Sequence, residues 1–351
     1  MNPALRLARP DILEMEPYRH ARWDPSLERM HANEMPWRTL GDNTLAGLNR
    51  YPEPQPLALL ERLAKLYDVR TGNVLAARGS DEAIDLLVRA FCRAGRDNVV
   101  ICPPTFGMYR VAAQIQGAGV IEVPLGTGDF APDMPGIVEA GRRARIVFLC
   151  SPNNPTGRLL EETAVLGVCR ELAENALIVV DEAYVEFSGA RSLARHLADN
   201  PNLVVLRTLS KAWALAGARC GCLLADREIV ELLRRIIPPY ALPATTIDEV
   251  LQFTERPQRA LTASRIETLL AERERLTKAL RSLPGVLRVF ESDANFLLVR
   301  CSDPAAFMTA AAAAGLLLRD FSQSAGLEGC LRITVGSPEQ NERLLTALEA
   351  S

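Results

Sequence analysis

Seven short apolar runs dominate the sequence between residues 73 and 226, and helical stretches separate most of them. The runs read NVLAA, NVVIC, GVIEV, RIVFLC, ALIVVD, NLVVL and CGCLLA, and they begin at residues 73, 98, 119, 145, 176, 202 and 220. The intervening stretches include DEAIDLLVRAF from Asp81 and TAVLGVCRELAE from Thr163. Near-continuous apolar strands that alternate with helices are typical of a mostly parallel sheet with helices on both faces. We therefore predict an α/β fold for this region.

The pattern changes after Pro238 and Pro239. An Arg/Glu-rich helical segment extends from about residue 257 to 283, and strand-like runs follow as VLRVF, NFLLVR, LLLRDF and CLRITVG. A segment rich in alanine begins at Pro304, and the chain closes with another helical pattern. This mixture predicts a smaller α+β domain over residues 241–351, beside a large domain over residues 51–240.

The first 50 residues are irregular and contain several prolines, in motifs such as HANEMPW and RYPEPQP. Such a segment is either a disordered arm or a strap that lies over another surface. Trp23, Trp37 and Tyr51 favour the strap, because disordered segments contain few aromatic residues. We expect an ordered N-terminal strap over residues 1–50.

The composition argues against several classes of protein. A formal net charge of −3 provides no basic surface for nucleic acid. The N-terminal segment lacks the apolar core of a signal peptide, and the longest small-apolar run, from Phe307, is too short to span a bilayer. The eight cysteines form no CxxC pair, and none of the three histidines is near a cysteine in sequence. We expect a cytoplasmic protein with reduced cysteines and no metal site.

Lysine is rare in this chain and occurs only at Lys65, Lys211 and Lys278. Lys65 and Lys278 lie among charged neighbours in helical patterns, as solvated side chains do. Lys211 instead lies in RTLSKAWALAGARCG, between the apolar runs NLVVL and CGCLLA. A lysine that can lose its proton forms Schiff bases with carbonyl compounds, which arginine cannot do. Lys211 is therefore a candidate for covalent catalysis, and a lysine that caps a strand end is the alternative.

Two motifs suit the binding of a phosphate group. RGSDEAIDLL follows a strand, turns at Gly79 and presents the N–H groups of Ser80 and Asp81 at a helix N-terminus, where phosphate binds readily. Acidic residues there also complement the helix dipole, which is the simpler interpretation of this motif alone. The motif around Lys211 adds two hydroxyls and a guanidinium, from Thr208, Ser210 and Arg219.

Three further motifs follow strands and suit a planar ring. CPPTFGMY offers Phe106, either as a core aromatic or as a flat surface for a ligand. SPNNPTG places Asn154 at a strand end, where ligands bind in α/β sheets, although a plain loop is the alternative. VVDEAY places Asp181 at the end of an apolar strand, with Tyr184 three residues on. A carboxylate there is costly unless it is paired, and a protonated ring nitrogen is a suitable partner.

Two arginines lie in strand-like runs of the smaller domain, Arg319 in LLLRDF and Arg332 in CLRITVG. An arginine among apolar residues pairs with an internal acid or binds an anionic ligand. Asp320 is a potential partner for Arg319, whereas Arg332 has no acidic neighbour in sequence.

Together these motifs provide the contacts that pyridoxal phosphate needs. In their order along the chain, the sequence closely resembles the fold-type I pyridoxal-phosphate-dependent aminotransferases, over nearly its whole length. The resemblance is carried by HANEMP, RYPEPQP, RGSDEAIDLL, CPPTFGMY, SPNNPTG, VVDEAY, RTLSKAWALAGARCG, LLLRDF and GCLRITVG. RYPEPQP and the last motifs favour the branch of the family that acts on histidinol phosphate.

The resemblance implies a role for each residue around the cofactor ring. Lys211 forms the imine with pyridoxal phosphate and moves the proton between Cα and C4′. Asp181 keeps the pyridine nitrogen protonated. Asn154 and Tyr184 hydrogen-bond the ring oxygen, and Phe106 stacks on the ring. The family often carries tyrosine where this chain has Phe106, so a hydroxyl contact to the substrate phosphate is missing.

The resemblance also implies the contacts to phosphate and substrate. The cofactor phosphate is held by the backbone of Ser80 and Asp81, by Thr208, Ser210 and Arg219, and by Tyr51 of a second subunit in a homodimer. Arg332 and Arg319 bind the anionic end of the substrate. Tyr18 and Asn33 in the strap help to close the site, and the strap joins the small domain to the dimer interface.

The implied reaction is a ping-pong transamination in which glutamate donates its amino group and imidazole-acetol phosphate receives it, giving 2-oxoglutarate and L-histidinol phosphate. A related aminotransferase for aromatic or other amino acids, or a phospho-amino-acid decarboxylase, are the enzymatic alternatives. A non-catalytic ligand-sensing domain is a further alternative, although no basic DNA-binding segment precedes the core. A nicotinamide-binding fold has little support, because the match GTGDFA from Gly126 is followed by Pro132 and not by a helix.

Overall fold

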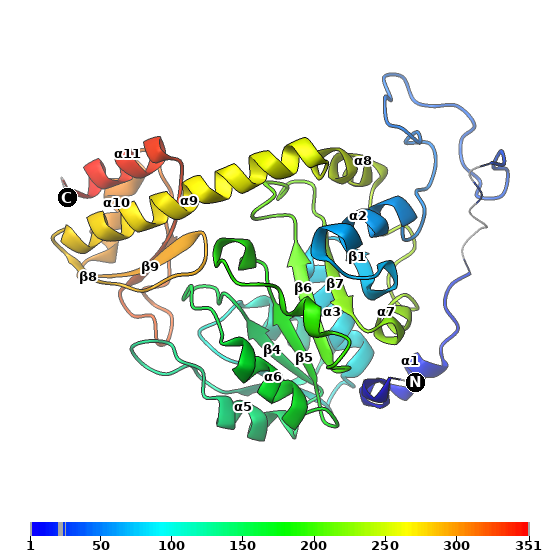
Figure 1. Ribbon diagram of the computed structural model, residues 1–351, viewed down its shortest axis with the longest axis horizontal. Helices are drawn as coiled ribbons and strands as arrows, with labels where there is room; N and C mark the ends of the chain where they lie inside the picture. The colour runs from blue at the N-terminus through cyan, green and yellow to red at the C-terminus, as the bar shows by residue number, and fades with distance from the viewer. Residues whose placement is uncertain (1, 20–23, 25, 350–351) are drawn as a thin grey trace.

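The computed structural model describes residues 2–19, 24 and 26–349 (Figure 1). A seven-stranded sheet forms its centre, in the order β1-β7-β6-β5-β4-β2-β3. Its strands are β1 (Val74–Ala77), β2 (Asn98–Ile101), β3 (Gly119–Glu122), β4 (Ile146–Cys150), β5 (Leu177–Asp181), β6 (Leu203–Thr208) and β7 (Gly221–Ala225). Each strand coincides with one of the seven predicted runs. Strands β2 to β6 pair in parallel, and β7 runs antiparallel to both of its neighbours, so the prediction of a mostly parallel α/β fold is confirmed.

Helices cover both faces of this sheet. One layer contains α1 (Pro10–Glu14), α3 (Ser80–Phe91), α4 (Met108–Gln116) and α7 (Arg227–Leu233). The other contains α2 (Leu57–Tyr67), α5 (Met134–Gly141), α6 (Glu162–Glu171) and α8 (Ala244–Phe253). Alternate strand residues face opposite layers: along β4, Phe148 faces the first layer, while Val147 and Leu149 face the second. The runs read as continuously apolar because both faces are buried.

A second, four-stranded sheet lies in the C-terminal part, in the order β10-β11-β9-β8. It contains β8 (Val286–Val289), β9 (Phe296–Cys301), β10 (Arg319–Asp320) and β11 (Cys330–Thr334), all paired antiparallel. The helices α9 (Arg256–Ser282), α10 (Pro304–Ala313) and α11 (Pro338–Glu349) accompany it, and α9 runs from the large sheet to the small one (Figure 1). Along the described chain, no helix has the length and apolar character that a membrane span requires.

The division between the two parts at residue 240 stays a prediction. Helix α8 follows that residue in sequence, yet its Ile247 and Val250 belong to the hydrophobic cluster beneath the large sheet.

The described short 3-10 helices are η1 (Pro3–Leu7), η2 (Thr71–Asn73), η3 (Val185–Phe187) and η4 (Leu193–His196).

The N-terminal 50 residues have two different environments. Residues 2–15 pack on the large domain, where Leu7 and Ile12 are buried against α3 and α7. Residues 26–51 stand away from the body of the chain (Figure 1), and Met30 and Trp37 are 96% and 76% exposed. Exposed apolar side chains in such numbers mark an interaction surface. Trp23, which contributed to the prediction of a strap, lies outside the described residues.

Candidate active site

A cavity of about 740 Å³ opens where the carboxyl ends of β1, β4, β5 and β6 meet the small sheet. This edge is where ligands bind in α/β folds. Most of the predicted site residues line the cavity: Ser80, Asp81, Phe106, Asn154, Asp181, Tyr184, Thr208, Ser210, Lys211, Arg219, Arg319 and Arg332. Residues far apart in sequence are thus brought together by the order of the strands.

Lys211 lies in the loop between β6 and β7, three residues after β6 ends at Thr208. The flanking strands are buried, but Lys211 itself is exposed to the cavity. Its Nζ lies 5.6 Å from the centre of the Tyr184 ring. Partial burial, and then the nearby Arg332 guanidinium, lower the pKa of Lys211. Both effects favour the neutral amine that nucleophilic chemistry requires.

Asp181 ends β5 at the floor of the cavity and is 3% exposed. The Tyr109 hydroxyl donates to its Oδ2 at 2.8 Å, and the backbone N–H of Ala183 donates to its Oδ1 at 3.1 Å. Burial raises the pKa of Asp181 to about 6, although both hydrogen bonds act in the opposite direction. Among the described residues no ion pair joins Asp181 to a basic side chain. A buried carboxylate of this kind fits a cationic ring nitrogen in the cavity.

The phosphate end of the cavity depends on two glycines. A Cβ on Gly79, whose φ is +80°, would lie 3.1 Å from Nη2 of Arg219. A Cβ on Gly221 would lie 2.8 Å from the carbonyl oxygen of Arg207 and 2.9 Å from the backbone nitrogen of Ser80. A side chain at position 79 would crowd the Arg219 guanidinium, and one at position 221 would displace the backbone at the N-terminus of α3. The missing side chains leave a cradle of N–H groups there that fits a phosphate.

The side chains beside this cradle are also suited to an anion. The Arg219 guanidinium reaches the Ser210 hydroxyl and the Asp81 carboxylate, each at 3.5 Å. The hydroxyl of Thr208 donates to that of Ser210 at 3.0 Å. Residues from the start of α3, the end of β6 and the β6–β7 loop therefore converge on one small volume.

The arginines of the small domain enter the cavity from the opposite side. Arg319 on β10 and Arg332 on β11 are directly paired in register, so their like charges face the same side of the sheet. Arg332 hydrogen-bonds Oδ1 of Asn154, while its buried Nε has no hydrogen-bond partner within the described chain. Two adjacent guanidiniums with an unused donor suit an anionic ligand.

The ring-contact residues surround this point. Nδ2 of Asn154 lies 3.5 Å from the hydroxyl of Tyr184, and burial raises the pKa of Tyr184, so its phenol stays protonated. Phe106 is partly buried, and its ring meets the Tyr109 ring edge-on at 5.6 Å between centres. These groups can hydrogen-bond one edge and cover one face of a planar ring.

Three predicted residues do not line the cavity within one chain: Tyr18, Asn33 and Tyr51. Tyr51 stacks on Tyr240, with 4.6 Å between ring centres. Asn33 and Tyr51 belong to the segment of residues 26–51, and Tyr18 precedes it. Their predicted contacts to cofactor and substrate stay predictions.

The sequence patterns did not assign roles to several residues of the site. One is Tyr109, which contacts Asp181. Another is Phe321, whose ring centre lies 5.6 Å from the guanidinium carbon of Arg319 and 5.7 Å from that of Arg332. Phe106 precedes α4 and Tyr109 lies on it, so a shared helix face gave no signal for Tyr109. For Phe321 the sequence carried no signal either, because its place depends on strand pairing.

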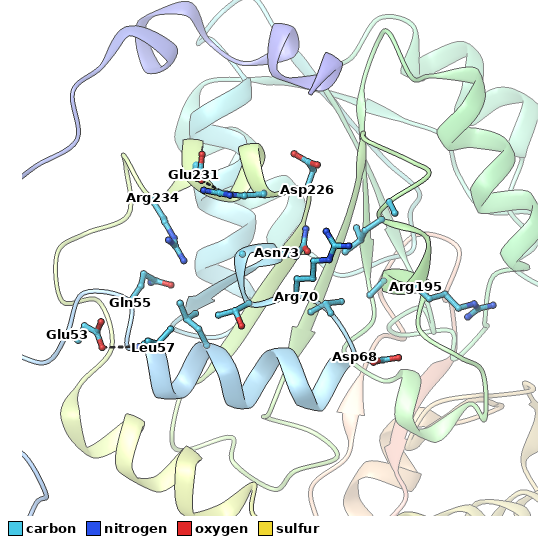
Figure 2. Close-up of a pocket in the computed structure, with 18 residues that line it drawn as sticks. Glu53, Gln55, Leu57, Asp68, Arg70, Asn73, Arg195, Asp226, Glu231 and Arg234 are labelled. Atoms are coloured by element: carbon cyan, nitrogen blue, oxygen red, sulfur yellow. Dashed lines mark hydrogen bonds and ion pairs between the residues drawn. The ribbon is translucent and has the colours of Figure 1, made fainter. Parts of the chain in front are cut away.

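A larger cavity of about 1000 Å³ lies elsewhere, between α2, the start of β1 and α7 (Figure 2). Several of its charged side chains have partners: Arg227 pairs with Glu231, and Asp226 caps α7 by accepting from the backbone N–H of Glu228. It contains neither Lys211 nor Asp181, so we do not assign the chemistry to it. The described residues also contain no cluster of His, Cys, Asp and Glu suited to a metal ion.

Comparisons with known proteins agree with this geometry. The sequence model of the family described as Aminotransferase class I and II matches residues 32–348. The chain is 46% identical to a histidinol-phosphate aminotransferase of Stenotrophomonas maltophilia, covering 100% of this chain and 98% of the relative. It is 48% identical to a histidinol-phosphate aminotransferase of Xylella fastidiosa, covering 91% and 88%. The solved histidinol-phosphate aminotransferase of Sinorhizobium meliloti, in complex with pyridoxal-5′-phosphate, has the same fold, with a TM-score of 0.75, 24% identity and coverage of 86% and 82%.

Proposed function

This chain belongs to the class I and II aminotransferases, and we propose that it is the transaminase of histidine biosynthesis. It converts L-histidinol phosphate and 2-oxoglutarate into imidazole-acetol phosphate and L-glutamate, reversibly and in two half-reactions. The observation that carries the proposal is the meeting of Lys211, Asp181 and the Arg319–Arg332 pair in one cavity. These groups provide an amine, a buried carboxylate and an anion site in a chain of this family.

Pyridoxal phosphate, when bound, supplies an aldehyde that accepts the amino group and a protonated ring that withdraws electrons from the reacting carbon. Lys211 would hold its aldehyde carbon, and Asp181 its ring nitrogen. Asn154 and Tyr184 would bind the ring oxygen, and Phe106 would cover the ring. The phosphate would lie at the N-terminus of α3, with the backbone of Ser80 and Asp81, the hydroxyls of Thr208 and Ser210, and Arg219.

The neutral amine of Lys211 is the base of the reaction. Its Nζ would take the proton from Cα of the amino donor and deliver it to the former aldehyde carbon of the cofactor, which a lysine of lowered pKa does efficiently near neutral pH. Asp181 stays ionised beside the ring nitrogen, because the hydrogen bonds from Tyr109 and Ala183 stabilise its charge. Arg332 and Arg319 bind the phosphate of histidinol phosphate and, in the other half-reaction, a carboxylate of glutamate.

We also propose a cytoplasmic homodimer. The segment of residues 26–51 carries exposed apolar side chains and has little contact with its own chain, as expected for a surface that a second copy covers. In the dimer, Tyr51 would reach the cofactor phosphate of the other subunit, and Tyr18 and Asn33 would close the site.

Turnover of purified protein with added pyridoxal phosphate tests the assignment. Histidinol phosphate with 2-oxoglutarate should give glutamate with a much larger kcat/KM than phenylalanine or aspartate as amino donor. Threonine phosphate should release no carbon dioxide. A preference for phenylalanine or aspartate would instead identify another aminotransferase, and carbon dioxide from threonine phosphate would identify a decarboxylase.

A further inference from the structure

Tyr109 contacts Asp181 but touches neither Lys211 nor the phosphate end of the cavity. We propose that Tyr109 is a positioning residue, whose hydroxyl fixes the orientation of the Asp181 carboxylate and keeps it ionised for the cofactor ring nitrogen. This inference rests on the proposed function, because that function supplies the ring nitrogen beside Asp181. The hydrogen bond between Tyr109 and Asp181 itself lies wholly within this chain.

The geometry holds the Tyr109 hydroxyl against Asp181, with the Cys150 thiol as its other polar neighbour. Tyr109 lies on α4 and is fully buried, and its ring stacks on Phe148 at 4.7 Å between centres, with 4° between the planes. Phe106 meets the same ring edge-on. With its ring held on two sides, Tyr109 can aim its hydroxyl at Oδ2 of Asp181 without losing further side-chain freedom.

The Asp181 carboxylate depends on few donors. It accepts one hydrogen bond from Tyr109 and one from the backbone of Ala183. Two oxygens offer about four acceptor sites, so acceptor capacity remains for a ring N–H. Since a side chain supplies one of the two protein donors, a single substitution can remove it.

The surrounding charges make this donor important. The ionisable groups that face Asp181 are Asp81 of α3, Tyr109 of α4, Cys150 of β4, Glu182 and Tyr184 after β5, and Lys211 after β6. Burial raises the pKa of Asp181, and Asp81 and Glu182 raise it further. The Tyr109 hydrogen bond is the strongest effect that lowers it. Burial and the neighbouring carboxylate also raise the pKa of Tyr109, which therefore remains a donor over the working range.

Tyr109→Phe removes the hydroxyl and keeps the ring. The pKa of Asp181 should then rise, and the proton shared with the cofactor should move from the ring nitrogen toward the carboxyl group. Tyr67→Phe is a matched control, because the Tyr67 hydroxyl is buried and has no hydrogen-bond partner in the described chain. Both substitutions delete one buried hydroxyl, but only the Tyr109 hydroxyl contacts Asp181.

The test begins with the cofactor-free protein. The infrared band of the protonated Asp181 carboxyl, identified by its loss in Asp181→Asn, is titrated with pH in wild type and both variants. We expect a wild-type midpoint near 6 and a Tyr109→Phe midpoint about one pH unit higher, a tenfold change in proton affinity. Tyr67→Phe should titrate like wild type. Equal midpoints in wild type and Tyr109→Phe would overturn the proposal.

The second measurement is the dissociation constant for pyridoxal phosphate by equilibrium dialysis at pH 5, below both expected midpoints, where the ionised fraction of Asp181 follows its proton affinity. It should rise about tenfold in Tyr109→Phe, in proportion to the shift in proton affinity, and stay unchanged in Tyr67→Phe. A shifted midpoint with unchanged cofactor affinity would also overturn the positioning role. Failure of wild type to bind the cofactor would instead refute the proposed function. If Tyr109→Phe does not fold, Tyr109→3-fluorotyrosine, a stronger donor, should lower the midpoint, and a midpoint that does not fall would count against the proposal.

Discussion

A buried ion cluster behind the active site allows a quantitative test of the structure. The Arg207 guanidinium on β6 donates to Glu182 at 3.2 Å and to Glu186 at 2.6 Å, and it lies 4.4 Å from the centre of the Tyr67 ring. The side chains of Arg207 and Glu182 are 6% and 3% exposed. The cluster links the end of β6, which leads to Lys211, with the end of β5, which carries the site carboxylate.

Arg207→Met removes one partner and leaves the carboxylate of Glu182 buried without a counter-charge. Breaking a buried pair in this way costs about 3–5 kcal/mol. At about 2 °C per kcal/mol for a chain of this size, the Tm should fall by roughly 6–10 °C. Arg281→Met is the matched control, because Arg281 and its partner Glu291 are exposed. That pair should contribute less than about 1 kcal/mol.

The same variant should show a defined pH dependence. Burial already raises the pKa of Glu182, and Arg207 opposes that effect. Without Arg207 the folded state binds a proton at Glu182 more tightly than the unfolded state does, so stability rises as pH falls. Thermal scans from pH 8 to pH 5 should therefore show the Tm of Arg207→Met approaching that of wild type. Equal Tm losses for Arg207→Met and Arg281→Met, or a loss independent of pH, would refute the reasoning.

Three further substitutions test other parts of the account. Gly221→Ala should abolish retention of pyridoxal phosphate on gel filtration, because its Cβ would lie within 2.9 Å of backbone at the start of α3; full retention would show that the cradle is not needed. Arg332→Leu should lower kcat/KM for histidinol phosphate roughly 10- to 100-fold, the loss of a charge-assisted contact, whereas Arg300→Leu on the neighbouring strand should have little effect. Asp97→Asn should lower the free energy of unfolding by about 2 kcal/mol at pH 7. Burial raises the pKa of Asp97, but hydrogen bonds, first from Arg93, outweigh burial and bring that pKa down to about 2. That stabilisation is present above the ordinary value of 3.8 and disappears as pH falls from there toward 2, so chemical denaturation at pH 7 and pH 3 should show a shrinking difference.

Much of the large sheet could be predicted because its strands are buried on both faces. Such strands read as unbroken apolar runs, and polar residues directly after them, such as Asn154 and Asp181, had to meet at one edge. The reversal of β7 could not be predicted, because an antiparallel strand in a covered sheet has the same apolar pattern as a parallel one. The helix α7, of 7 residues, carries too few turns for a clear period.

The remaining site residues depend on contacts between distant segments. The contact between Tyr109 and Asp181 joins residues 72 positions apart, and their motifs give no sign of it. The apolar runs on both sides of Lys211 suggest a buried lysine, but Lys211 is exposed in the loop between β6 and β7. Tyr51 illustrates a different limit, because its predicted contact involves a second chain.

The most direct test of the central claim is to locate the lysine that holds the cofactor. The protein has only three lysines, so borohydride reduction of the protein with pyridoxal phosphate, followed by peptide mass spectrometry, gives an unambiguous assignment. We predict a single modified peptide that contains Lys211, and no fixed cofactor or visible absorption band in Lys211→Ala. Modification at Lys65 or Lys278, or a band that borohydride still fixes in Lys211→Ala, would contradict the account.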